Sequence, residues 1–245
     1  MAGKNNNNKK RNVVKSASTR TNGSYYVLGI IALIGVSILG YSLMRKQAPV
    51  VGTDATGGGV PSGPAEGYTL GKADAPVKII EFADFECPGC GQFATVTEPD
   101  VRARIINAGL ANITFYDFPL PQHKNSQPAH NAAACAADQN KFWEFHDRLY
   151  ATQDQWNTEA TDNPRPFFEK YAADLGLNTK VWGDCYDARK HNGRILANLA
   201  EGERRQVGQT PTFIIADKAY PGALPYDALK AIVDSATPKA APAGK

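Results

Sequence analysis

The sequence predicts an α/β domain preceded by a single transmembrane helix. The β-branched run VKIIEF at 77–82 is typical of a buried strand, and TFIIA at 212–216 indicates a second short strand. After residue 90 the apolar residues change to helical spacing and can share one helix face: Phe93, Val96, Val101 and Ile105. Residues 25–44 contain no charged side chain. Together these three observations indicate strands and helices behind a membrane segment.

Residues 25–44 are long enough to span a bilayer. At about 1.5 Å per residue, a helix of this length covers roughly 30 Å, the thickness of the hydrocarbon core. A cleaved signal peptide is the open alternative, but its apolar core is shorter and ends at a small-x-small site. Six basic residues precede the span and two follow it, so the N-terminus is expected in the cytoplasm and the rest outside. We expect a single-pass anchor in the cell membrane, with the folded part extracytoplasmic.

The other segments divide by composition. Residues 1–24 are basic, contain four consecutive asparagines and are expected to be disordered in the cytoplasm. Residues 45–67 are rich in Gly, Pro and Ala, which predicts a flexible linker, and 236–245 form a similar tail. The remaining segment, 68–235, is long enough to bury a core. We expect one folded domain there.

The charge balance argues against a nucleic-acid partner. Residues 1–46 hold eight of the 27 basic residues and none of the 24 acidic ones. The remainder carries 19 basic and 24 acidic side chains, a balance of −5. Nucleic-acid binding requires a basic face, which this composition does not predict.

Cys87 and Cys90 form a C-x-x-C pair at the predicted strand-to-helix junction. Pro88 falls in the first helical turn, where its missing N–H costs nothing. A helix N-terminus presents partial positive charge that stabilises a thiolate, the form that attacks a disulfide. This placement predicts Cys87 as the nucleophile and Cys90 as the more buried, resolving thiol.

Two other interpretations of the pair remain open. A zinc site requires a second C-x-x-C or matching histidines, whereas Cys135 and Cys185 are 50 residues apart and the four histidines show no ligand spacing. A purely structural Cys87–Cys90 disulfide closes a very small loop and stabilises little. The strand, C-x-x-C, helix order favours a redox pair, with no metal and no bound organic cofactor.

Three motifs in this order resemble the DsbA-like thiol:disulfide oxidoreductases: GKADAPVKIIEFADFECPGC, AHNAAACAADQNKFWEFHDRLY and GQTPTFII. The resemblance implies a thioredoxin fold interrupted by a helical insertion at about 127–201. It further implies four strands in the sheet, near 77–82, 113–118, 212–216 and 218–221.

The resemblance also implies site residues. Cys87 and Cys90 match the active pair, and Thr210-Pro211 matches a cis-proline loop that binds substrate, although most X-Pro bonds are trans. Glu81, six residues before Cys87, matches a buried acid that helps to move the proton of Cys90; the alternative is that Glu81 points to solvent. A buried carboxylate has a raised pKa and can exchange protons near neutral pH.

This chain departs from the best-known pattern at Gly89. The Pro88-Gly89 dipeptide lacks the polar side chain that can stabilise a thiolate. The oxidising strength of the pair is therefore left open.

Cys135 and Cys185 make the cysteine count even, which favours a disulfide outside the cytoplasm. The loop would contain about 50 residues and contribute roughly 4 kcal/mol in the chain-entropy model. Two buried free thiols, or a second redox relay, are the alternatives.

The function expected from these residues is disulfide formation in exported proteins. The family resemblance implies reoxidation by a membrane quinone-linked partner, either DsbB-like or vitamin K epoxide reductase-like. A low-potential thiol reductase of the same fold and a non-catalytic tethered holdase or assembly factor are the alternatives.

Overall fold

The computed structural model describes residues 60–238. The predicted cytoplasmic segment 1–24 and transmembrane segment 25–44 lie outside the described residues, as do most of the linker and of the tail. Within 60–238, no helix combines the length and the apolar character needed to cross a membrane.

A five-stranded mixed sheet forms the centre of the domain, in the order β1-β3-β2-β4-β5. β2 and β3 are parallel, and every other pairing is antiparallel. The α/β prediction is confirmed, with one short edge strand that the sequence did not indicate, β1. The strands are β1 (Tyr68–Leu70), β2 (Val77–Ala83), β3 (Ala111–Asp117), β4 (Thr212–Ile215) and β5 (Lys218–Pro221).

The helix that begins after Cys87 runs on to residue 106 and includes two π-helical stretches. Its parts are α2 (Pro88–Gln92), η1 (Phe93–Thr97), α3 (Glu98–Val101) and η2 (Arg102–Ile106). Pro99 lies in the first turn of α3 and does not end the helix. The expectation that Val96 shares the buried face is wrong, because its side chain is 69% exposed. Five residues separate Val96 from Val101, about 140° around a regular helix, so helical spacing itself turns Val96 away from that face.

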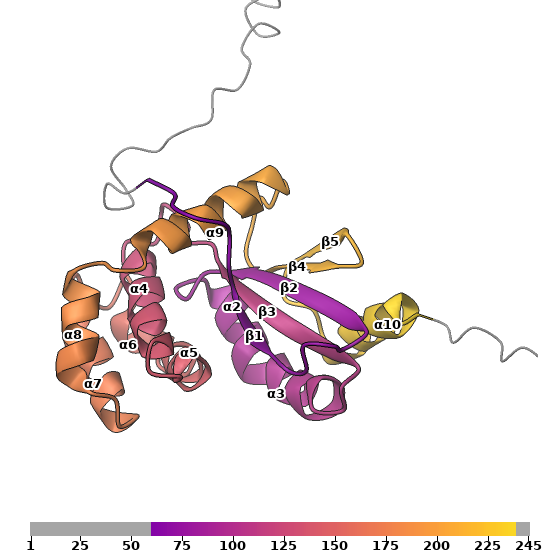
Figure 1. Ribbon diagram of the computed structural model, residues 1–245, viewed down its shortest axis with the longest axis horizontal. Helices are drawn as coiled ribbons and strands as arrows, with labels where there is room; N and C mark the ends of the chain where they lie inside the picture. Colours follow the sequence, from indigo (N-terminus) through magenta and orange to yellow (C-terminus); the bar gives the residue numbers. More distant parts are fainter. Residues whose placement is uncertain (1–59, 239–245) are drawn as a thin grey trace, which may run out of the picture. The chain divides into compact units, whose positions relative to one another are not determined.

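The expected helical insertion lies between β3 and β4, where Figure 1 shows α4 to α8 grouped to one side of the sheet. The helices are α4 (Ser126–Ala137), α5 (Phe142–Ala151), α6 (Gln153–Trp156), α7 (Arg165–Asp174), α8 (Thr179–Asp187) and α9 (Asn192–Arg204). α7 is closed by Gly176, whose positive φ of 73° lets its N–H reach the carbonyl of Ala173.

Two helical layers cover the sheet. On one face, the helix after Cys87 and α10 (Tyr226–Ala236) bury Ile79, Ile113 and Phe213. α9 packs against the other face. A Cβ atom on Gly202 of α9 would lie 2.4 Å from the Phe118 ring, so this close approach requires glycine. Because side chains alternate along a strand, every second residue of β2 faces the helix after Cys87.

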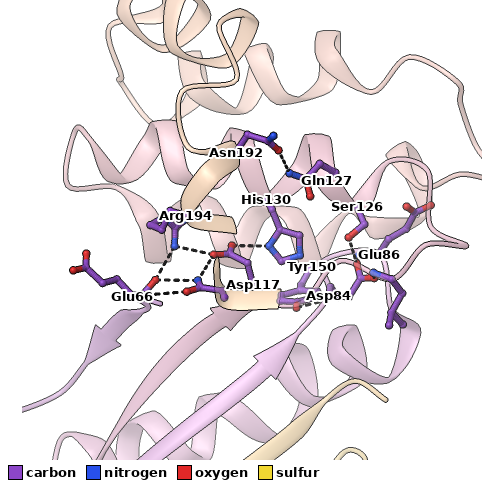
Figure 2. A network of polar contacts seen from close by, with 12 residues as sticks. Glu66, Asp84, Glu86, Asp117, Ser126, Gln127, His130, Tyr150, Asn192 and Arg194 are labelled. Carbon is purple, nitrogen blue, oxygen red and sulfur yellow. Dashed lines mark hydrogen bonds and ion pairs between the residues drawn. The ribbon is translucent and has the colours of Figure 1, made fainter. Parts of the chain in front are cut away.

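The end of the predicted linker is attached to α9. The Glu66 N–H donates to the side chain of Asn198 (2.9 Å), and the Glu66 carbonyl accepts from Asn198 and from Arg194. Buried Asp117 joins this group, accepting from Arg194 and Asn198 and contacting His130 Nδ1 at 2.7 Å (Figure 2). Residues next to β1 are thus held by the insertion.

Candidate active site

Cys87 and Cys90 lie where β2 passes into the helix. Cys87 is the N-cap residue of α2, with extended backbone angles (φ −72°, ψ 123°), and Pro88 begins the helix. Cys90 lies one turn later, is completely buried and faces the core, whereas Cys87 keeps 8% of its surface exposed. Both are free thiols, so the structure describes the reduced form. Only Cys87 is open to attack from outside.

The loop before β4 lies against the Cys87 sulfur. The Thr210–Pro211 peptide bond is cis. The Cys87 thiol donates to the carbonyl oxygen of Thr210 at 3.3 Å. A Cβ atom on Gly89 would lie 3.4 Å from Pro211 Cδ, an ordinary van der Waals distance, so the first turn of α2 packs directly against the proline loop. Cys87 and Thr210-Pro211 are therefore adjacent.

The two thiols have opposite pKa shifts. The hydrogen bond from the Cys90 thiol is the largest cause that lowers the pKa of Cys87, to about 6. The Thr210 side chain and the N–H groups of Cys90 and Gly89 act in the same direction, against burial, which raises this pKa. Burial raises the pKa of Cys90 well above its usual value. The thiolate is thus concentrated on Cys87, the less buried of the two sulfurs.

Glu81 is buried beneath the pair, so the interpretation in which it points to solvent is wrong. It has 2% of its surface exposed and lies on the same face of β2 as Ile79. Phe115 and Phe213 are its neighbours on the two adjoining strands. Burial, followed by the nearby Glu98 carboxylate, raises the pKa of Glu81 well above its usual value. Its charge contributes to the raised pKa of Cys90, which places the two groups within electrostatic reach.

Asp84 organises the loop that carries Cys87. Its carboxylate is completely buried and accepts from the N–H groups of Glu86 and Leu120, each at 2.8 Å. It also accepts from the Ser126 hydroxyl at 2.5 Å, drawn in Figure 2, and contacts His123 Nδ1 at 2.7 Å. The bond to Asp84 raises the pKa of His123. This carboxylate joins the end of β2 to the segment that leads into α4.

Gln153 holds the same loop from the insertion. Its Nε2 donates to the carbonyl oxygens of Phe85 (2.7 Å) and Cys87 (3.0 Å). Sequence reasoning missed both Gln153 and Asp84. Nothing in the motif pointed to Gln153, 63 residues after Cys90. The acids at 84 and 86, directly beside an apolar strand, were the available signal for Asp84.

Cys135 and Cys185 are joined in a disulfide that links α4 to α8. Their Cα atoms are 5.8 Å apart, and 50 residues separate them in the chain. Cys135 is 1% exposed and Cys185 is 9% exposed. The bond therefore ties two helices of the insertion together.

Comparisons with known proteins agree with this architecture. A family model described as thioredoxin matches residues 65–235. The Na(+)/H(+) antiporter NhaA 3 of Salinispora tropica is 32% identical over 219 residues, which cover 84% of this chain and 32% of that protein. The probable disulfide bond formation protein D of Bacillus anthracis is 35% identical over 96 residues, 37% of this chain and 44% of that protein. The chain thus spans less than half the length of either relative.

Solved structures with the same fold include two bacterial proteins. Oxidised BdbD from Bacillus subtilis has a TM-score of 0.60 and 21% identity, covering 72% of this chain and 98% of that one. Wolbachia pipientis α-DsbA1 has a TM-score of 0.63 and 21% identity, covering 72% and 93%. At these identities the likeness is one of fold.

Proposed function

The chain belongs to the thioredoxin family, and we propose that it is a thiol:disulfide oxidoreductase that oxidises cysteine pairs of exported proteins. One observation carries the proposal: Cys87, the less buried of the two thiols, has its pKa lowered to about 6, while the fully buried Cys90 thiol has its pKa raised. A pair that only stabilised the fold would not need one accessible sulfur with thiolate character.

The proposed reaction begins with the Cys87–Cys90 disulfide. A substrate thiolate attacks Cys87 Sγ, a mixed disulfide forms, and Cys90 leaves as a thiolate that takes up a proton. A second substrate thiolate then attacks the substrate sulfur of the mixed disulfide, and Cys87 leaves as a thiolate. Two electrons pass from the substrate dithiol to the enzyme, and the substrate gains one S–S bond.

Glu81 and the proline loop have supporting roles in this proposal. Glu81 gives a proton to the Cys90 thiolate as it leaves, and takes it back when the enzyme is reoxidised. Its burial and raised pKa suit that exchange near neutral pH. The backbone at Thr210-Pro211 borders Cys87 Sγ and would hold an extended substrate peptide across it.

The direction of electron flow follows from thiolate stability. A stabilised Cys87 thiolate stabilises the reduced enzyme and makes it an oxidant. Reference pKa values for the nucleophilic cysteine are about 7 in thioredoxin and about 3.5 in DsbA, and about 6 for Cys87 lies between them. A reductase is the second candidate, because Pro88-Gly89 supplies no side chain to stabilise the thiolate.

The proposed place of action is the outer side of the cell membrane. The uncharged run at 25–44 would be the anchor, and the basic excess before it favours a cytoplasmic N-terminus. The reduced enzyme would then be recharged by a membrane quinone-linked partner, DsbB-like or vitamin K epoxide reductase-like. The proposal rests on the cysteine site and not on the antiporter relatives, since the chain covers 32% of NhaA 3.

Trapping the mixed disulfide tests the proposal. Cys90→Ser leaves Cys87 without its resolving partner, so incubation with a peptide disulfide should give one peptide bound covalently per chain. Cys87→Ser, the matched control, should bind none. Equal labelling of the two variants, or none in either, would contradict the oxidoreductase. Full suppression of aggregation by the double variant, without labelling of either single variant, would favour the holdase.

A further inference from the structure

Two further potential metal ligands surround the Cys135–Cys185 disulfide. A ring nitrogen of His191 and the two sulfur atoms all lie within 4.8 Å of one another. Asp138 Oδ2 lies 3.7 Å from Cys185 Sγ and 3.0 Å from His191 Nε2. The end of α4 supplies Cys135 and Asp138, α8 supplies Cys185, and His191 directly precedes α9. Three elements thus bring the two disulfide sulfurs and an imidazole together, with the Asp138 carboxylate beside Cys185 and His191.

We propose that these four residues form a binding site for Zn²⁺ whenever the disulfide is open. The same two thiols exist in the newly made chain before it is oxidised, and in a chain reduced by an external dithiol. In the second case the dithiol gives two electrons, its own sulfurs become a disulfide, and Cys135 and Cys185 take up its two protons. Binding of Zn²⁺ then displaces both thiol protons.

The donor set and its spacing suit this ion. Zn²⁺ prefers four ligands from thiolate, imidazole and carboxylate groups at about 2.0 to 2.3 Å. A tetrahedron of that size keeps its ligand atoms roughly 3.3 to 3.8 Å apart. The 3.7 Å separation of Asp138 Oδ2 from Cys185 Sγ lies in that range, and its 3.0 Å separation from His191 Nε2 would lengthen slightly around an ion. Because the Cα atoms of Cys135 and Cys185 are 5.8 Å apart, side-chain rotation alone can separate the freed sulfurs.

A Zn²⁺ ion can reach this site from solvent through the partly exposed side chains of His191 and Asp138. The sulfur-bearing residues are buried, whereas the side chains of His191 and Asp138 are 17% and 30% exposed. Lys190 forms an ion pair with Asp138 at 2.8 Å and would have to release it. Its side chain is 59% exposed and can turn into solvent. The ligands thus form a partly open site next to the buried sulfurs.

Disulfide formation and ion binding exclude each other, because both use the same two sulfur atoms. The ion therefore stabilises the dithiol state, and oxidation releases it. The proposed Zn²⁺ site lies in the helical insertion, and it does not depend on the redox role proposed for Cys87 and Cys90.

The experiment uses the full-length Cys87→Ser/Cys90→Ser chain, so that the active-site thiols bind no metal. The chain is reduced with a phosphine, freed from metal without oxygen and titrated with Zn²⁺ against a chromophoric chelator. One ion should bind per chain in the reduced form and none in the disulfide form. Adding His191→Ala should weaken binding at least 100-fold, and Asp138→Asn at least tenfold. Asp187→Asn, the matched control on α8, should change it less than twofold.

Several results would overturn the site. These are equal binding by the reduced and disulfide forms, no binding by the reduced form, or unchanged affinity after His191→Ala. Circular dichroism covers the case in which reduction unfolds the chain. Zn²⁺ should then restore the native spectrum in the Cys87→Ser/Cys90→Ser chain and not in its His191→Ala variant, and failure to restore it also overturns the proposal.

Discussion

The Cys87 thiol donates to the Thr210 carbonyl oxygen at 3.3 Å, although 123 residues separate the two in the chain. The sheet explains their meeting, because Phe82 of β2 lies opposite Thr212 of β4 in antiparallel register. The chain leaves β2 toward Cys87 at the edge where it enters β4 from Pro211. The nucleophile and the proline loop are therefore neighbours by strand pairing.

The Thr210 hydroxyl should set part of the acidity of Cys87. Its oxygen is buried without a hydrogen-bond partner while the thiol donates to the carbonyl. Once the thiol ionises, the hydroxyl can donate to the sulfur, which lowers the pKa of Cys87. Thr210→Val should raise this pKa by about one unit, a change of about 1.4 kcal/mol. The pH dependence of Cys87 alkylation measures the shift.

Thr212→Val is the matched control for that substitution. The Thr212 hydroxyl donates to the Gln209 carbonyl at 2.7 Å and not to a cysteine. Its loss should cost about 1 kcal/mol of stability and leave the alkylation midpoint unchanged. An equal midpoint shift in both variants would mean that loop disturbance, not the Thr210 hydroxyl, acts on Cys87.

The stability of the reduced chain should depend on the ionisation of Cys87. Below about pH 6 the thiol is protonated in both the folded and the unfolded chain and contributes nothing. Between about pH 6 and its usual value of about 8.5, the unfolded chain binds more protons, so the free energy of unfolding rises with pH. Above about pH 8.5 the raised pKa of Cys90 means that the folded chain binds more protons than the unfolded chain, so the free energy of unfolding falls again.

Denaturant unfolding of the reduced chain from pH 5 to 8.5 measures this contribution. The excess stability over Cys87→Ser should grow across the interval by about 3 kcal/mol. A constant difference between the two reduced chains would show that the Cys87 pKa is not lowered.

Glu81→Gln should separate the stability and proton-transfer roles of this acid. Because burial raises the folded pKa of Glu81, its contribution to stability falls as pH rises above about 4.3, the usual value for glutamate. The neutral amide should therefore stabilise the chain at pH 8 by about 1 to 3 kcal/mol and lose that advantage near pH 4. Denaturant unfolding at the two pH values measures both effects.

The same variant should slow reoxidation. With Glu81 absent, the Cys90 thiol loses its buried proton acceptor, and attack by Cys90 on a mixed disulfide at Cys87 should slow by about 10²-fold. Stopped-flow release of a fluorescent thiol from Cys87 measures this step. An unchanged rate in a correctly folded variant would remove Glu81 from the proton path.

Removing the Cys135–Cys185 disulfide should lower the free energy of unfolding but leave the acidity of Cys87 almost unchanged. Cys135→Ala/Cys185→Ala opens a loop of about 50 residues and should lower the free energy of unfolding by about 4 kcal/mol. The midpoint of Cys87 alkylation should stay within about 0.3 pH units, since neither residue is among the causes of its pKa shift. A large shift of that midpoint would instead connect the two cysteine pairs.

Local patterns predicted much of the site. The apolar run before Cys87 predicted β2, the change of periodicity predicted the helix, and Pro211 before an apolar run located the second loop. These signals depend on the strand period, the helix period and the backbone of proline, and each is read within a few residues. Cys87 and Cys90 were found for this reason.

The contacts that support the Cys87 loop could not be predicted from the sequence, because they depend on tertiary packing. Gln153 meets the Cys87 loop only after the insertion folds against it, and a single glutamine in a polar segment carries no local signal. Val96 was misplaced because it lies about 140° from Val101 around a regular helix, so it never shared the face of the other apolar residues. β1 was missed because a three-residue edge strand is too short for a periodic pattern.

The reduction potential of the Cys87–Cys90 pair tests the central claim most directly. The full-length chain would be equilibrated with glutathione buffers, and the redox state of Cys87 trapped by alkylation. The lowered pKa of Cys87 predicts a potential between about −120 and −200 mV, in the range of proteins that donate disulfides. A potential near −270 mV, as in thioredoxin, would contradict the oxidase and establish the reductase.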